Sequence, residues 1–327
     1  MVALRLLSEL ALLALVALGL NRLVPPPWRS RGILLLKAYL TLRVLGLIFL
    51  HETNGVTILS LLGEHLSGIP LGSFLLFCFY AMLLKLVGIA ASITRWILML
   101  RGQKVELPVR HIVGAFFIGR FLGTFLPSTL GLDGYKLYDA SRFSGRTIEV
   151  SAATIVEKLL GSSAIFGTFL IALPLGAAGF PEYATLIATV GIPVALTPLL
   201  IVSLMLFWPG PRLIRWILVR VPLPTLRGSL SRIADGASAY SDRKGLLLAA
   251  WGLSLVQHFT TAAMYVPAAR ALGVSASDSP FWIVTFASSI QILATVLSPF
   301  TIAGEGIREL AQGLLLQNQM TFGLAAA

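Results

Sequence analysis

Long apolar stretches separated by short polar segments dominate the chain. Seven of these stretches are long enough to cross about 30 Å of hydrocarbon as tilted helices. They cover residues 4–21, 32–50, 71–99, 147–177, 183–208, 245–270 and 309–327. Two further apolar stretches, 108–127 and 280–299, each begin and end with proline. This pattern predicts an all-α, polytopic membrane protein with about seven transmembrane helices.

The composition supports a membrane protein and narrows the classes of partner. Hydrophobic residues make up 57% of the chain and charged residues 12%, with a mean hydropathy of +0.87, whereas soluble domains carry about 25% charged residues. The net charge of +11 is explained by basic cytoplasmic loops, so no nucleic-acid partner is expected. The single cysteine, Cys78, and four scattered histidines offer no disulfide framework and no metal site. No cofactor is expected.

Lysine and arginine concentrate in four of the loops between the apolar stretches. These loops are 22–37, 101–110, 128–146 and 209–244, whereas 51–70, 178–182 and 271–280 contain no lysine or arginine. The positive-inside rule places the four basic loops in the cytoplasm, with the chain in the plasma (inner) membrane.

The stretch 108–127 lies between two of these basic loops. If it crossed the membrane, the basic loops would fall on opposite sides. We therefore expect it to enter and return on the cytoplasmic side as a re-entrant hairpin. Three glycines would let its arms turn and pack closely, namely Gly114, Gly119 and Gly123.

A shift of 172 residues aligns this region with a second one. LPSTLGLDGYK at 126–136 and LSPFTIAGEGIR at 297–308 both contain P-x-T-x-x-x-(D/E)-G-x-(K/R). The loop charges give the helices before the two copies opposite directions, which predicts an inverted repeat of the kind found in transporters. A single membrane domain, 1–327, then holds a first repeat at 32–177 and a second at 183–327. The second re-entrant stretch is 280–299.

Each copy places an acid three residues before a base, and glycine and proline flank both. Acid and base at this spacing can neutralise each other on one helical face. Free N–H groups after a broken helix can hold an anion, and a base there could hold a phosphate head group. A simpler alternative is that each motif only caps a helix and anchors it at the membrane interface. The expected broken-helix residues are Pro127, Gly131, Gly134, Pro299, Gly304 and Gly306.

Other charges lie within apolar stretches, where each costs roughly 2.5–3.5 kcal/mol on insertion scales. A Glu157–Arg120 ion pair is the natural expectation, because their segments are close in sequence. Arg120 could instead bind a lipid phosphate, and a buried pair that only fixes packing is the alternative. Arg95 lies near a helix end, where snorkelling suffices. The predicted head-group-binding residues are Lys85, Arg120, Asp133, Lys136, Glu157, Lys158, Glu305 and Arg308.

Three strings carry a resemblance to a known family. FIGRFLGTFLPSTLGLDGYKLYDASR at 117–142, VEKLLG at 156–161 and SPFTIAGEGIRE at 298–309 resemble the flippase-like family. That family includes the transmembrane region of bacterial lysylphosphatidylglycerol synthases (multiple peptide resistance factor) and many stand-alone homologues. The matching residues are Pro127, Gly131, Asp133 and Lys136, then Glu157, Lys158 and Gly161, then Gly304, Gly306, Arg308 and Glu309.

The residues that differ from the family's usual pattern affect the expected substrate more than the expected fold. Lys136 replaces the family's usual arginine, Thr124 stands near a common asparagine, and Ser128 and Phe300 replace glycines. Because no synthase domain follows within the chain, we expect a stand-alone member that does not lysylate lipid.

The resemblance implies movement of a polar lipid or lipid-linked head group between leaflets. Phospholipid, hopanoid and polyprenyl-phosphate types are candidate cargoes. No P-loop, zinc-protease or D-x-D motif occurs in the sequence, so no catalytic residue is predicted. A lipid-linked glycosyl- or phosphotransferase and a membrane scaffold stay as alternatives. A homodimer and a complex with a lipid-modifying enzyme both remain open.

Overall fold

The computed structural model describes residues 56–125, 130–207, 243–277, 280–297 and 306–316, together with Tyr240 and isolated positions between 35 and 53. These residues are almost entirely helical, as the apolar pattern predicts. The exception is one pair of two-residue antiparallel strands, β1 (Glu52–Thr53) and β2 (Val56–Thr57), which precedes the short helix α3 (Ile58–Ser67).

Four of the predicted spans are present as helices long and apolar enough to cross a membrane. The first two are α4 (Leu71–Gly102) and α7 (Thr147–Gly176), which η1 (Ala177–Gly179) continues. The third runs from η2 (Pro181–Tyr183) through α8 (Ala184–Leu186) and η3 (Ile187–Gly191) into α9 (Ile192–Phe207). The fourth is α12 (Lys244–Ala263) with α13 (Tyr265–Ala271). The predicted span 4–21 lies outside the described residues, 32–50 is described only at isolated positions, and 309–327 only as far as Leu316.

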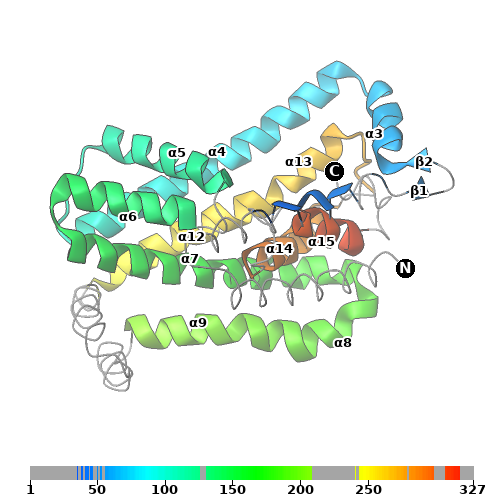
Figure 1. The fold of residues 1–327 in the computed structure, drawn as a ribbon. Coiled ribbons are helices and arrows are strands. Elements are labelled where there is room, and N and C mark those ends of the chain that lie inside the picture. The colour runs from blue at the N-terminus through cyan, green and yellow to red at the C-terminus, as the bar shows by residue number, and fades with distance from the viewer. Residues whose placement is uncertain are drawn as a thin grey trace, which may run out of the picture.

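Helices α4 and α12 run antiparallel along one another (Figure 1). At one end the Tyr240 hydroxyl, just before α12, donates to the carbonyl of Met99 near the end of α4, at 2.5 Å. Farther along, Gly88 of α4 faces Thr260 of α12 so closely that a Cβ atom there would lie 2.9 Å from the threonine hydroxyl. The small residue lets the two backbones approach.

Helices α5 (Val109–Phe125) and α6 (Leu130–Ser144) form a hairpin beside α4 and α7. They occupy the left half of Figure 1. The chain returns to the end from which it left, because Arg146 after α6 donates to the Lys104 carbonyl before α5, at 2.6 Å. The expectation that 108–127 would itself turn back at its glycines is wrong, since α5 is one continuous helix. The second arm of the hairpin is α6.

A second hairpin begins at the opposite end of the molecule. Helix α14 (Phe281–Leu297) packs on α15 (Ile307–Leu316), where the Gln312 amide donates to the Ser288 hydroxyl at 3.2 Å. The bounds of α14 are those of α5 shifted by the same 172 residues that align the sequence motifs. The first turn of α14 lies beside the far end of α7, since a Cβ atom on Gly179 would meet Ile283. The inverted repeat stays a prediction.

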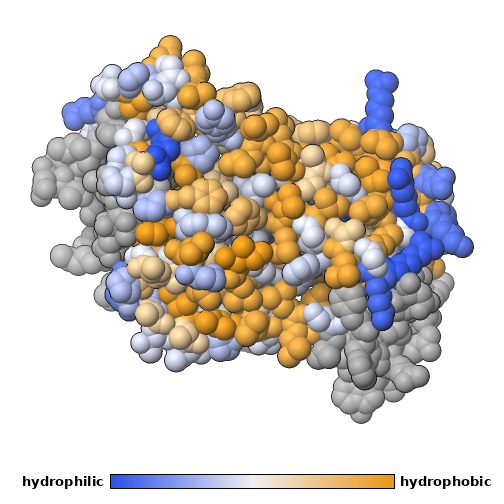
Figure 2. Space-filling model, turned by 180° about the vertical axis from the view of Figure 1, so that it is seen from behind, coloured by the Kyte–Doolittle hydropathy of each residue, from blue (hydrophilic) through white to orange (hydrophobic). Residues whose placement is uncertain are grey.

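The core of the described residues consists of two clusters joined by α7. One cluster contains Trp96, Leu100, Val156 and Leu247 and lies toward the end of the bundle that carries the basic loop 101–110, which we call the basic end. The other contains Phe169, Phe286 and Leu316 and lies toward the opposite end. Seen from behind, the surface is broadly hydrophobic, with hydrophilic residues collected toward the two ends (Figure 2). That distribution suits a protein whose flank faces lipid and whose ends face water.

Tyr240 offers a test of the contact that fixes α12 against α4. Burial raises the pKa of the Tyr240 hydroxyl, which keeps it protonated and donating to the Met99 carbonyl. Tyr240→Phe should lower the free energy of unfolding by about 0.5–1.5 kcal/mol, the net value of one hydrogen bond. Thermal unfolding in detergent measures this. Tyr138→Phe removes an exposed hydroxyl and should change little; equal losses from both variants would contradict the assignment.

Candidate functional site

A buried carboxylate in α7 organises a group of charged residues inside the bundle. Glu157 is 3% exposed and accepts hydrogen bonds from two helices. Arg95 of α4 donates to Oε1 from Nε at 3.2 Å and from Nη2 at 3.0 Å. Lys136 of α6 donates to Oε2 from Nζ at 2.8 Å. Both carboxylate oxygens are therefore engaged, and α4, α6 and α7 are tied together at one point.

The ion pairs continue from this point toward the surface. Asp133 of α6 lies 3.9 Å from the Lys136 ammonium and accepts from Lys158 of α7 at 2.7 Å. Lys158 is half-exposed, whereas Lys136 is buried over the Trp96 ring, 4.4 Å from its centroid. We call Arg95, Glu157, Lys136, Asp133 and Lys158 the ion network.

Helical spacing explains why the network forms. Asp133 and Lys136 are three residues apart and so share the face of α6 that meets α7. Arg95 is held from a third side, because its Nη1 donates to the Ser254 hydroxyl of α12 at 2.9 Å. Gly161, one turn after Glu157, lies beside the guanidinium, with which a Cβ atom there would be in ordinary van der Waals contact at 3.5 Å. Glu157 therefore has a hydrogen-bond donor at each of its oxygens, as a buried carboxylate requires.

Two expectations about these charges are wrong. Glu157 pairs with Arg95 and Lys136 rather than with Arg120. Arg95 does not snorkel to the interface, since its side chain is 8% exposed and points into the bundle. A signal for this pair exists in the sequence: Arg95 lies seven residues before the end of α4, and Glu157 ten residues after the start of α7. Both helix ends belong to the basic end, so the two residues have similar depth.

Three other predicted residues form a second group, which we call the cation cluster. Lys85 of α4 lies within electrostatic range of Arg120 of α5 and Arg308 of α15. Arg308 also donates to Oε1 of Glu309, at 2.9 Å from Nε and 2.6 Å from Nη2. One residue of each hairpin thus lies within electrostatic range of Lys85 near the middle of α4. Every predicted head-group residue that the structure describes belongs either to this cluster or to the ion network.

The broken-helix residues have different roles from one another. Gly306 has a φ of +85° directly before α15, a conformation that favours glycine, and its N–H donates to the Glu309 carboxylate at 2.6 Å. Gly131 and Gly134 lie inside the continuous helix α6, so neither breaks a helix. The remaining predicted residues of this kind, with Glu305, lie outside the described part: Pro127, Pro299 and Gly304.

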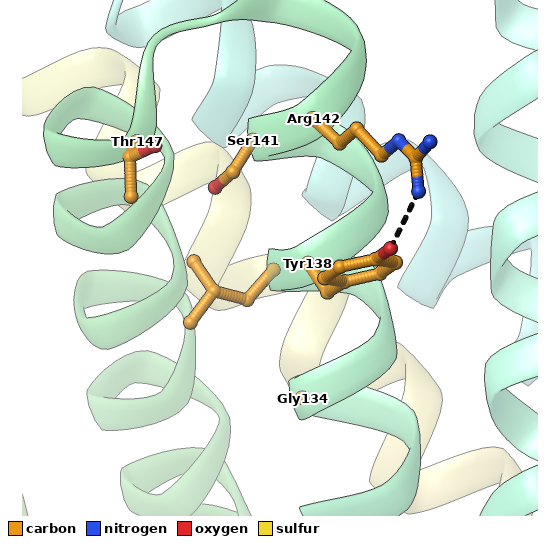
Figure 3. Close-up of a pocket in the computed structure, with 6 residues that line it drawn as sticks. Gly134, Tyr138, Ser141, Arg142 and Thr147 are labelled. Carbon is orange, nitrogen blue, oxygen red and sulfur yellow. Dashed lines mark hydrogen bonds between the residues drawn. The ribbon is translucent and has the colours of Figure 1, made fainter.

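An open groove of about 400 Å³ lies between α6 and the start of α7. Figure 3 shows Tyr138 and Arg142 on one wall, with the Arg142 guanidinium donating to the Tyr138 hydroxyl at 2.8 Å. Gly134, Leu137, Ser141 and Thr147 complete the lining. Of the predicted site residues only Gly134 belongs to it. Among the residues that the structure describes, no group of three His, Cys, Asp or Glu side chains is arranged to hold a metal ion.

Comparison with protein families identifies one that covers most of the chain. Residues 32–327 match the family described as the lysylphosphatidylglycerol synthase TM region. Comparison with curated proteins gives no match, and comparison with solved structures gives none either. The match includes both hairpins, the ion network and the cation cluster. The chain therefore belongs to the lysylphosphatidylglycerol synthase TM-region family of membrane proteins.

Proposed function

We propose that this protein moves a polar lipid, or a lipid-linked head group, between the two leaflets of the membrane. The observation that carries the proposal is the pair of short apolar helices α5 and α14. They have matching bounds under the 172-residue shift and begin at opposite ends of the molecule. Each is 17 residues long, about 25 Å at 1.5 Å per residue. We interpret the two hairpins as re-entrant units of an inverted repeat.

Such an arrangement suits alternating access. Inverted repeats place a binding site at the middle of the bilayer and expose it to either side by rocking one unit against the other. Lys85 of the cation cluster lies near the middle of α4, within electrostatic range of one residue from each hairpin. The family match supports a lipid cargo, because membrane domains of this family are linked to lipid translocation. The basic end of the bundle would face the cytoplasm.

Reconstitution tests this proposal directly. The purified protein is placed in vesicles with lipids that carry a fluorescent head group or acyl label, and leaflet exchange is followed by dithionite quenching. We expect exchange above that of protein-free vesicles. Arg120→Ala should reduce it about tenfold, the value of one charge-assisted contact. Arg101→Ala, an exposed arginine at the end of the same bundle, is the matched control.

The alternatives give different results in the same vesicles. A lipid-modifying enzyme would produce a new lipid species detectable by mass spectrometry. A scaffold would show neither exchange nor a new species. Either of these two outcomes would overturn the proposal.

A further inference from the structure

The groove between α6 and the start of α7 is lined by no residue of the ion network or the cation cluster. It has a volume of about 400 Å³. Leu137, Tyr138, Ser141 and Arg142 form its α6 wall as two pairs spaced four residues apart, so they share one side of that helix. The groove therefore follows about the last two turns of α6. It reaches the basic end, where Arg146 contacts the Lys104 carbonyl.

Arg142 is the exception among the charged side chains from α6 to Lys158. Each of the others has an oppositely charged or protonatable partner: Asp133 with Lys158, Lys136 with Glu157, Asp139 with His111, and Arg146 with Glu149. Within the described residues Arg142 forms no ion pair, and its guanidinium donates to the neutral Tyr138 hydroxyl at 2.8 Å. That hydrogen bond holds the guanidinium at the groove and leaves its other N–H groups available for an anion.

Two hydroxyl groups add polar positions to this lining. The Ser141 hydroxyl is buried and has no hydrogen-bond partner in the part of the chain that the structure describes. Figure 3 shows it on the side of α6 that faces α7. Thr147, on the α7 side of the groove, is exposed. Because buried hydroxyls are normally hydrogen-bonded, a ligand with several oxygen acceptors would supply the partner that Ser141 lacks.

The surface beside the groove is apolar, as expected of a face that contacts lipid. Tyr138 in the lining is 58% exposed, and Phe143 and Ile148, which directly follow lining residues in sequence, are 56% and 39% exposed. Lipid covers such side chains in a membrane protein. An apolar groove that ends in an unpaired cation at the basic end matches the two parts of a phospholipid, whose acyl chains lie in the hydrocarbon and whose phosphate lies at its boundary.

We infer that this groove binds one anionic phospholipid of the leaflet at the basic end, as a resident lipid and not as cargo. Arg142 holds the phosphate, since a guanidinium matches two phosphate oxygens. Ser141 and Thr147 donate to the remaining polar oxygens, and one acyl chain lies against Leu137. The unpaired positive charge favours a lipid with net negative charge over a zwitterionic one. Because α6 and α7 both line the groove, the bound lipid braces the first hairpin against the bundle.

Lipid binding to the purified full-length protein tests this inference. Dioleoylphosphatidylglycerol, dioleoylphosphatidylcholine and glycerol 3-phosphate are added separately in detergent, and binding is measured by native mass spectrometry. We expect the phosphatidylglycerol to bind at least about tenfold more tightly than the other two. Arg142→Gln should weaken its binding about tenfold. Thr147→Trp should do the same, because the indole fills the groove while the guanidinium remains.

Arg101→Gln is the matched control. It removes the same charge from an exposed arginine in the last turn of α4 that does not line the groove, so phosphatidylglycerol binding should be unchanged. Thermal unfolding gives a second readout: phosphatidylglycerol should raise the Tm of the parent protein and not that of Arg142→Gln. The Tm values without added lipid check that each variant is folded.

Three results would overturn the resident-lipid site. These are equal affinity for the two phospholipids, equal losses from Arg142→Gln and Arg101→Gln, and unchanged binding in Thr147→Trp. Glycerol 3-phosphate binding as tightly as the phosphatidylglycerol would show an anion site that needs no acyl chain, and would overturn it as well. None of these measurements depends on leaflet exchange, so this inference and the proposed function succeed or fail separately.

Discussion

Glu157→Ala is expected to lower the free energy of unfolding by about 3–5 kcal/mol, because it leaves the buried charges of Arg95 and Lys136 without their shared partner. The loss exceeds that of an exposed ion pair, since water cannot solvate the two cations in place of the carboxylate. Denaturation of the purified protein in detergent, followed by circular dichroism, measures the change.

Glu149 provides the matched control for this variant. It lies in the same helix and pairs with Arg146 at 2.9 Å, but both side chains are at least one-third exposed. Glu149→Ala should therefore cost at most about 1 kcal/mol. Replacing the three buried charges together, with Arg95→Leu, Lys136→Met and Glu157→Leu, should recover much of the lost stability. Equal effects of Glu149→Ala and Glu157→Ala would show that the network is not what holds α4, α6 and α7.

Gly131→Ala is expected to separate the two arms of the first hairpin. A Cβ atom at position 131 would lie 2.5 Å from the Cα atom and 2.8 Å from the nitrogen of Gly123. Both of these are backbone atoms, so no side-chain rotation relieves the overlap and α5 must move away from α6. Overpacking of this kind costs about 1–3 kcal/mol. We expect lower thermal stability and slower lipid exchange in vesicles.

Gly134→Ala is the control for this hairpin, three residues later in the same helix. A Cβ atom there would meet nothing within 4 Å, and alanine is the better helix former by roughly 0.5–1 kcal/mol. The variant should be neutral or slightly stabilised, with exchange unchanged. A loss from Gly134→Ala as large as that from Gly131→Ala would contradict the close contact of α5 with α6.

The position of a helix in this fold can be predicted from the sequence wherever one physical rule determines it. Hydropathy located α4, α7, the run from η2 to α9, and α12 with α13 within a few residues, because the width of the hydrocarbon sets the length of a span. The spacing of Pro108 and Pro280 located α5 and α14, since proline is tolerated at the start of a helix and not in its interior. Of the three glycines of α5, Gly119 and Gly123 lie against Leu132 of α6, whereas a Cβ atom on Gly114 would meet nothing within 4 Å.

Contacts that depend on which helices pack against each other could not be predicted from the sequence. The partner of Glu157 is set by how α4 packs on α7, and closeness in sequence favoured Arg120 instead. The turn of the hairpin was expected at Gly114 to Gly123, yet glycine is common within membrane helices as a packing residue. Gly134 likewise resembles a hinge in sequence and lies in open space on a regular helix.

The order of the charges along the chain has a consequence for biosynthesis. Arg95 and Lys136 both precede Glu157, so two cations leave the ribosome before the carboxylate that neutralises them. Until α7 follows, the nascent α4 carries Arg95 without its carboxylate, a charge that lipid alone solvates poorly. The early helices are therefore best retained beside the translocon until the counter-charge arrives, and a chain truncated before α7 should be recognised by quality-control proteases.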